Sequence, residues 1–221
     1  GWNAALALVC GDPVIAKPSE KTPLTQLAIQ RICERAMARF GADAPDGLIQ
    51  TLIGERDLGE VLTASRDVAL ISATGSVPMG KAVAADMSKR LGKTILELGG
   101  NNAMIVAPSA DLEMAVRAIV FSAVGTAGQR CTSLRRLIVH EDVYDQLIPR
   151  LTKVYAGLSI GNPLEDDTLV GPLIDKGAMT AMDKALTQAR GEGGIIHGGG
   201  QALADQHPDT AYVHPAIVEM P

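Results

Sequence analysis

The sequence predicts an α/β protein in which helices pack against mainly parallel strands. Strand-like apolar runs alternate with helical runs along the first half of the chain, which is the order that builds a parallel sheet. Of the 221 residues, 47% are hydrophobic but only 3% are aromatic. Aliphatic side chains must therefore fill the core, as they do where helices cover parallel strands.

The first half of the chain begins with a helix over Gly1–Cys10 and a short strand over residues 13–16. A longer helix begins with Thr22 as N-cap and Pro23 at the first helical position. Apolar residues then recur every four positions until the helix ends near Gly41. The remaining elements expected here are a strand at 48–52, a helix after 54–59, a buried strand at 68–73, a helix at 74–91 and a strand at 94–98.

The second half of the chain continues with strands and helices in alternation. Asp111 is expected to cap a helix over residues 112–124. The other elements expected are strands at 103–106, 136–140 and 216–220 and helices at 141–156 and 176–190. The last of these helices is followed by the glycine-rich stretch 191–200, in which Gly198-Gly199-Gly200 is interpreted as a connection to a late strand. We expect a domain boundary at 98–101, which gives two domains, 1–98 and 99–221.

Composition excludes several classes of function. The formal net charge of −5 and the lack of a Lys/Arg cluster argue against a nucleic-acid partner. The longest apolar run, residues 4–10, is too short to span a bilayer, so no membrane is expected. Three cysteines without paired spacing favour a reducing, cytoplasmic compartment. No metal site is expected, because His140-Glu141 lacks the second histidine of a zinc helix, and the later histidines are interpreted as solvated.

The stretch Val124–Thr132, V-G-T-A-G-Q-R-C-T, carries the main candidate for chemistry. It places Cys131 directly after Arg130, on a turn that follows a helix. A neighbouring cation favours the thiolate, and Gly125 and Gly128 let the backbone bend close to a ligand. The alternative is that Cys131 is a small buried hydrophobe, which is the common role of a lone cysteine.

A carboxylate upstream favours the catalytic reading of the cysteine. The strand Thr94–Leu98 carries Glu97 near its end and is followed by Gly99-Gly100. A carboxylate in an apolar strand is costly unless it is solvated or paired. We therefore place Glu97 at the carboxyl edge of a sheet, where open α/β sheets form their sites.

Two further stretches are suited to a nucleotide. The turn Gly75–Gly80 follows a strand and opens a helix, so it offers backbone donors to phosphate, although it lacks the G-x-G-x-x-G pattern. The stretch Lys17-Pro18-Ser19-Glu20 ends the first strand. Each has a plain alternative, a strand-to-helix turn for the first and a solvated loop for the second.

The combination of E-L-G-G and G-Q-x-C resembles the aldehyde dehydrogenase superfamily. The longer motifs, E-L-G-G-N-N and G-T-A-G-Q-R-C-T, are similar to those of the antiquitin-like branch of this superfamily, the α-aminoadipic semialdehyde dehydrogenases. This resemblance implies that Cys131 is the nucleophile and Glu97 the general base. An aldehyde would be oxidised to a carboxylate through a cysteine thiohemiacetal and a thioester. The presence of Glu97 favours hydrolysis of the thioester over transfer to coenzyme A.

The resemblance also implies a Rossmann-like cofactor half, here incomplete, and the start of a second α/β catalytic domain. Gly75, Ser76 and Gly80 match the family's G-S-x-x-x-G cofactor turn. The resemblance assigns to the adenosine ribose the lysine and glutamate of K-P-S-E, here Lys17 and Glu20. A carboxylate there would repel a 2′-phosphate, so NAD is expected rather than NADP. Leu98, which follows the base, completes the predicted cofactor residues.

Members of the superfamily are longer at both ends, so we expect an internal fragment whose own activity is weak. Asn3 is not the oxyanion asparagine of the family, because the residues after it match a later stretch. The full-length protein is expected to be a homo-oligomer that acts on a small-molecule aldehyde, an amino-acid semialdehyde. The alternatives are a general or succinic semialdehyde dehydrogenase and an inactive homologue that serves as a binding or oligomerising module.

Arg130 is the candidate substrate residue. By the resemblance, it helps to recognise a polar semialdehyde, and its guanidinium can bind a carboxylate with two parallel hydrogen bonds. The alternatives are that it lowers the pKa of the thiol or pairs with a protein carboxylate.

Overall fold

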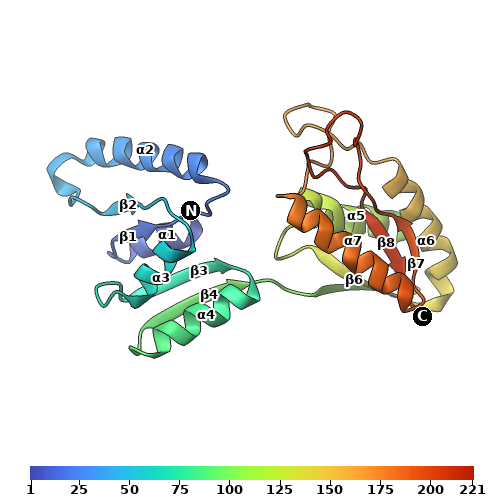
Figure 1. Cartoon of the computed structure of the whole chain (residues 1–221), viewed down its shortest axis with the longest axis horizontal. Coiled ribbons are helices and arrows are strands. Elements are labelled where there is room, and N and C mark those ends of the chain that lie inside the picture. Colours follow the sequence, from blue (N-terminus) through green and yellow to red (C-terminus); the bar gives the residue numbers. More distant parts are fainter. The chain divides into compact units, whose positions relative to one another are not determined.

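The computed structural model describes all residues from 1 to 221, and they form two compact units, Gly1–Leu98 and Gly99–Pro221. Within each unit, helices pack beside short strands (Figure 1). The strands pair two by two, and three of the four pairs are parallel. The α/β class predicted from the sequence is therefore confirmed.

The first unit contains two parallel strand pairs. Its elements in chain order are α1 (Trp2–Val9), β1 (Val14–Ala16), α2 (Pro23–Phe40), η1 (Gly41–Asp43), β2 (Ile49–Thr51), α3 (Arg56–Ala64), β3 (Leu70–Gly75), α4 (Val77–Ser88) and β4 (Lys93–Leu98). Strand β1 pairs with β2, and β3 pairs with β4 over six residues. Because β3 and β4 run in the same direction, Gly75 and Leu98 end the two strands side by side.

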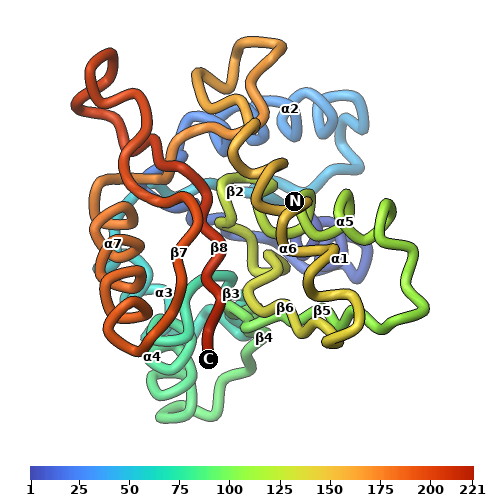
Figure 2. Tube along the Cα trace, turned by 90° about the vertical axis from the view of Figure 1, so that its right-hand side faces the viewer, coloured from blue at the N-terminus to red at the C-terminus, as the bar shows by residue number.

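The second unit contains one parallel and one antiparallel pair. Its elements are β5 (Asn102–Val106), α5 (Leu112–Val124), η2 (Gly125–Gly128), β6 (Leu134–Val139), α6 (Glu141–Ala156), α7 (Lys176–Gly191), β7 (Ile195–Gly198) and β8 (Ala216–Glu219). Strand β5 pairs with β6 in parallel, with a shift of register between Asn102 and Ala103. Strands β7 and β8 are antiparallel, and the trace in Figure 2 shows them next to each other.

The core of the second unit is aliphatic and joins β5, α5 and α6. Its buried members are Val106, Ile119, Val143, Leu147 and Leu151. Burying side chains of this size stabilises a fold by about 1.5–3 kcal/mol each. This core fixes α5 in place, and α5 leads directly into the turn that carries the cysteine.

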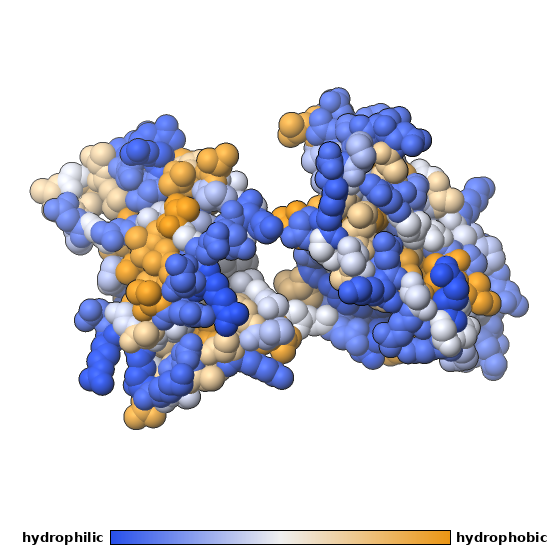
Figure 3. All heavy atoms as spheres, in the orientation of Figure 1, coloured by the Kyte–Doolittle hydropathy of each residue, from blue (hydrophilic) through white to orange (hydrophobic).

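The sequence did not predict all of these elements correctly. The strand expected to be buried is β3, whose residues are half-buried or exposed in this chain. Figure 3 shows apolar side chains at the surface of both units. Thr22 stands at the N-cap of α2 as expected, but its side chain makes no capping hydrogen bond. Asp111 does cap α5, accepting hydrogen bonds from two backbone N–H groups.

The glycine-rich stretch 191–200 contains strand β7, which the sequence did not predict, and Gly198 of the expected connection is the last residue of this strand. Its residues take part in a ladder with β8, in which Ile196 faces Val218 and His197 faces Ile217. The strand combines the β-branched pair Ile195-Ile196 with a partner strand that lies about twenty residues further along the chain.

No helix of the structure combines the length and the apolarity that a bilayer crossing requires. Nor does the structure contain a group of three or more side chains of the metal-binding types arranged to hold an ion.

Candidate active site

The cysteine turn, residues 125–133, begins where α5 ends. Gly125 leaves the helical conformation, with φ −51° and ψ 131°. Thr126, Ala127 and Gly128 then adopt positive φ values of 58°, 52° and 69°. The sequence predicted a bend supported by glycine, yet two of these three left-handed positions carry side chains, where this conformation is disfavoured. The turn presents Cys131 as an exposed residue, so it is not the buried hydrophobe of the alternative reading.

Hydrogen bonds hold the peptide groups on both sides of Cys131. The carbonyl of Arg130 accepts from the Ser133 N–H at 3.2 Å. The carbonyl of Cys131 accepts from Nδ2 of Asn102 at 2.8 Å. No acceptor within the chain takes the Cys131 N–H, which is therefore available to an anion beside the thiol.

Arg130 folds back over the turn instead of extending away from it. Its Nε donates to Oγ1 of Thr126 at 2.7 Å, and its guanidinium lies 5.6 Å from the centre of the Phe121 ring. No carboxylate of the chain forms an ion pair with it. The alternative in which Arg130 pairs with a protein carboxylate thus has no support within this chain, and it stays a prediction. The roles in substrate binding and in thiol activation stay predictions.

The predicted cofactor turn lies at the carboxyl edge of the β3–β4 pair. Ser76 is the N-cap of α4, and its Oγ accepts from the Met79 N–H at 3.3 Å. Because Pro78 has no N–H, the N–H groups of Ser76 and Val77 are the donors that this helix start offers to an anion. The positive end of the helix dipole adds to this attraction.

Gly80 allows α4 to approach β4 closely. The residue is buried, and a Cβ built on it would lie 2.5 Å from Cδ2 of Leu98. Gly75 is constrained in the same way, because its Cβ would lie 2.6 Å from Cε of Met79. An added carbon at Gly75 or Gly80 would therefore force the Met79 or Leu98 side chain to move, apart from any role of the glycines in ligand binding.

Glu97 faces Thr74 in the strand register, one residue before the end of β4. The β3–β4 edge thus brings Glu97 and Leu98 together with the proposed cofactor turn, a pairing that the sequence did not predict. Glu97 is exposed in this chain.

Lys17 lies directly after β1 and reaches the loop after β2. Its Nζ donates to the carbonyl of Pro18 at 2.9 Å and to that of Gly54 at 2.8 Å. An ammonium group has three donors, so one remains for a ligand. Glu20 is exposed on the turn that follows and has no hydrogen bond to Lys17.

Sequence reasoning missed two residues that shape the cysteine turn. Asn102 reaches the turn from β5, and Ser133, which is only 1% exposed, accepts the Arg130 N–H on its Oγ at 3.0 Å. For Asn102, the sequence did contain a signal, because it is the second asparagine of E-L-G-G-N-N. A side-chain amide at the start of a strand carries two N–H donors that need acceptors.

A separate polar cluster, Tyr144–Glu219–His197, joins α6 to the β7–β8 pair. Glu219 accepts a short hydrogen bond from the Tyr144 hydroxyl, and its Oε1 lies 2.6 Å from Nε2 of His197. These contacts hold the pKa of Glu219 below its usual value and raise the pKa of Tyr144 to about 12. His197 was predicted to be solvated, but its side chain is only 30% exposed and is paired.

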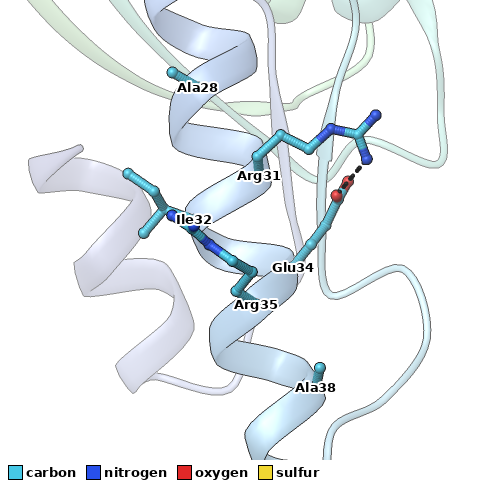
Figure 4. A pocket seen from close by; sticks show the side chains of 6 residues that line it. All are labelled: Ala28, Arg31, Ile32, Glu34, Arg35 and Ala38. Atoms are coloured by element: carbon cyan, nitrogen blue, oxygen red, sulfur yellow. Dashed lines mark hydrogen bonds and ion pairs between the residues drawn. The ribbon is translucent and has the colours of Figure 1, made fainter.

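A shallow hollow on the surface of α2 contains none of the predicted site residues (Figure 4). All of its lining comes from this one helix: Ala28, Arg31, Ile32, Glu34, Arg35 and Ala38. Arg31 and Glu34 form an exposed ion pair across it at 2.8 Å. A hollow on one helix face offers little enclosure, so we do not regard it as a ligand site.

Comparison with known proteins finds matches that cover both units of the chain. The model of the "Aldehyde dehydrogenase family" matches residues 1–221. Over 220 residues the chain is 46% identical to a putative aldehyde dehydrogenase family 7 member A1 homolog of Caenorhabditis elegans, covering 99% of this chain and 40% of that protein. It is 39% identical over 218 residues to alpha-aminoadipic semialdehyde dehydrogenase of Bos taurus, with the same coverage. The chain thus spans about two fifths of the length of these relatives.

Solved structures with high similarity belong to enzymes of differing specificity. Betaine aldehyde dehydrogenase of Staphylococcus aureus, in complex with NAD⁺, is 29% identical with a TM-score of 0.91, covering 98% of this chain and 42% of that one. Succinate-semialdehyde dehydrogenase of Burkholderia pseudomallei is 32% identical with a TM-score of 0.88, covering 97% and 43%. An NADP dependent enzyme of E. coli is 32% identical with a TM-score of 0.90, covering 99% and 44%. With the family model matched over its whole length, the chain belongs to the aldehyde dehydrogenase family.

Proposed function

We propose that the protein containing this chain oxidises an amino-acid semialdehyde to the corresponding carboxylate with NAD. The observation that carries this proposal is the exposed thiol of Cys131, on a turn whose flanking peptide groups are both held by hydrogen bonds. Residues 1–98 would form the cofactor part and residues 99–221 the cysteine-bearing part. The full-length protein is proposed to be a homo-oligomer.

Cys131 is the nucleophile of this reaction. Its thiolate attacks the carbonyl carbon of the aldehyde, and the oxygen becomes an oxyanion that can accept a hydrogen bond from the Cys131 N–H. Loss of hydride from this adduct leaves a thioester on the cysteine. Glu97 is the general base that takes a proton from the thiol, from the hydrolytic water, or from both. Hydrolysis of the thioester releases the carboxylate and restores the thiol.

The residues of the first unit fit a dinucleotide. The free N–H groups of Ser76 and Val77 suit a diphosphate, and the close approach at Gly80 keeps the turn tight beside Leu98. Lys17 and Glu20 would hold the adenosine ribose. NAD bound there would accept the hydride released from the thiohemiacetal.

Arg130 is proposed to select the substrate. Its guanidinium is exposed next to Cys131 and is oriented by Thr126 and Phe121. A cation held in this way can bind the carboxylate tail of a semialdehyde. The name of the Bos taurus relative, alpha-aminoadipic semialdehyde dehydrogenase, supports this class of substrate. Succinate semialdehyde, which also carries a carboxylate, is the second candidate.

The decisive experiment measures aldehyde oxidation by the natural protein that contains residues 1–221. A panel of aldehydes with and without a carboxylate is assayed with NAD for the wild type, Cys131→Ala and Glu97→Gln. We expect Cys131→Ala to abolish turnover and Glu97→Gln to accumulate the acyl-enzyme, seen as added mass on the cysteine. Cys10→Ala, at another exposed cysteine, is the matched control and should keep full activity. Equal rates for the wild type and Cys131→Ala would refute the mechanism.

The choice of cofactor is tested by steady-state rates with NAD and NADP. The Glu20 carboxylate would repel a 2′-phosphate, so the wild type should prefer NAD. Glu20→Gln should lower that preference by raising kcat/KM for NADP. A wild-type preference for NADP would contradict the role given to Glu20.

A further inference from the structure

Two peptide planes meet at the α-carbon of Cys131, and each is held at its carbonyl oxygen. The plane before the cysteine is held through Arg130 O, which accepts from the Ser133 N–H and, at 3.3 Å, from Nη2 of Arg135. The plane after it is held through Cys131 O, which accepts from Asn102. Because a peptide group is planar, fixing both planes fixes φ and ψ at Cys131. The directions of the thiol and of the Cys131 N–H follow from these two angles.

Asn102 is the one side chain that holds the second plane. Its Nδ2 donates to Cys131 O at 2.8 Å and to Ser133 O at 3.0 Å, so one amide spans the turn on both sides of Thr132. Asn102 itself is fixed, because it is the first residue of β5 and pairs with Leu134 of β6. The turn is thereby attached to the sheet of its own unit.

Gly100 leaves the space that this contact needs. A Cβ built on Gly100 would lie 2.9 Å from Oδ1 of Asn102 and 3.4 Å from Cys131 O. A methyl group there would displace the amide. At Gly99, by contrast, no atom lies within 4 Å of the added carbon. Gly100, but not Gly99, is therefore needed for the observed position of the Asn102 side chain.

We infer that Asn102 is a positioning residue that sets the orientation of the Cys131 thiol and N–H for attack on the aldehyde. This inference rests on the proposed function of Cys131. Asn102 need not touch substrate or cofactor, and it acts through the Cys131 carbonyl. Without the two N–H donors of Asn102, the peptide group after Cys131 can rotate. The thiol and the Cys131 N–H are then no longer aligned together for attack on the aldehyde.

The test is Asn102→Asp in the natural protein that contains this chain. The change keeps the shape of the side chain but removes both donors. We expect kcat for aldehyde oxidation to fall about a hundredfold, as misplacement of a reacting group by about 1 Å does. The KM for NAD and the thermal midpoint should stay close to wild type. Loss of fold, in contrast, would lower the midpoint and raise the KM for NAD as well.

Asn101→Asp is the matched control, because Asn101 is the adjacent asparagine, is exposed, and makes no side-chain hydrogen bond within the chain. It makes the same chemical change and should keep the wild-type kcat. Gly100→Ala tests the contact without changing Asn102 and should lower kcat, whereas Gly99→Ala should not. If Asn102→Asp fails to fold, this glycine pair decides the question.

The outcomes separate the two proposals. If aldehyde oxidation does not require Cys131, the proposed function fails and the positioning role falls with it. If oxidation requires Cys131 but Asn102→Asp and Gly100→Ala retain the wild-type kcat, only the positioning role is overturned. An equal loss of kcat in Asn101→Asp and Asn102→Asp would also overturn it, since the added charge would then be the cause.

Discussion

Glu219 has a pKa below its usual value because the Tyr144 hydroxyl and His197 bind its ionised form. The carboxylate therefore stabilises the fold above its unfolded pKa, near 4.5, and this contribution is lost as the pH falls through the folded pKa. Tyr144 behaves in the opposite sense. Its pKa rises from 10.0 to about 12, so the stabilisation is complete below pH 10 and is lost towards pH 12.

We expect the free energy of unfolding to decrease between pH 10 and 12, and to decrease less in Tyr144→Phe.

Glu219→Gln should lower the free energy of unfolding by about 1.5 kcal/mol at pH 7 and weaken the dependence of this free energy on acid. Urea unfolding followed by far-UV circular dichroism measures both effects. Glu165→Gln, at an exposed residue without a side-chain partner, should leave the stability unchanged. Parallel alkaline curves for the wild type and Tyr144→Phe would contradict the assignment.

At the residue scale, short motifs predicted the roles of Cys131 and Glu97. The structure places Glu97 next to the last residue of β4 and Cys131 on the turn between η2 and β6. The sequence could not identify the support of the cysteine. Asn102 lies 29 positions from Cys131, so the contact becomes evident only when β5 and β6 pair. Likewise, no local rule predicts that Thr126 and Ala127 adopt left-handed conformations, because their own preferences oppose it.

At the element scale, helices with local start signals were predicted well. The helix expected at 141–156 matches α6, and the one expected at 112–124 matches α5. Strand β7 was missed because its formation depends on β8, which lies beyond a long loop. Capping was predicted from residue type alone, which succeeded for Asp111 and failed for Thr22.

The two caps allow a paired test. Asp111 accepts hydrogen bonds from the N–H groups of Glu113 and Met114, whereas Thr22 makes no such bond. We expect Asp111→Ala to lower the free energy of unfolding by about 1 kcal/mol, the usual loss for a cap, and Thr22→Ala to have little effect. Denaturant unfolding of both variants under the same conditions measures the difference. Equal losses would show that residue type alone decides the contribution.

The junction of α4 with β4 provides a second test at this scale. Gly80→Ala forces Leu98 to move, and overpacking of this kind costs about 1–3 kcal/mol. Because the same junction holds the proposed cofactor turn, the KM for NAD should rise as well. Gly59→Ala is the control, since its added carbon would meet only Cε of Lys17, at an ordinary 3.8 Å. A rise in KM without loss of stability would indicate a direct role of Gly80 in binding.

At the scale of the whole molecule, the predicted roles are divided between the two units. The proposed cofactor residues lie in Gly1–Leu98, and the thiol with its supports lies in Gly99–Pro221. Composition and the order of elements were enough to predict the α/β class, because both follow from local sequence. The pairing of strands into four short sheets was not predictable, since it depends on contacts between distant residues.

This division predicts separable losses of function. Cys131→Ala should abolish oxidation but keep the wild-type Kd for NAD, measured by calorimetry. Gly80→Ala should weaken NAD binding while the rate at which iodoacetamide alkylates Cys131, measured without NAD, stays unchanged. The exposed Cys10 provides an internal reference for the alkylation rate. A slower reaction at Cys131 in Gly80→Ala would contradict the division.

The amide of Asn102 also bears on protein engineering. Transplanting G-Q-R-C-T into another scaffold would carry over the cysteine but not the hydrogen bond from Asn102 to its carbonyl. Asn102 belongs to a separate strand, β5. A graft that aims to reproduce the proposed nucleophile must therefore include two discontinuous pieces, the cysteine turn and the start of β5 with the glycine before it.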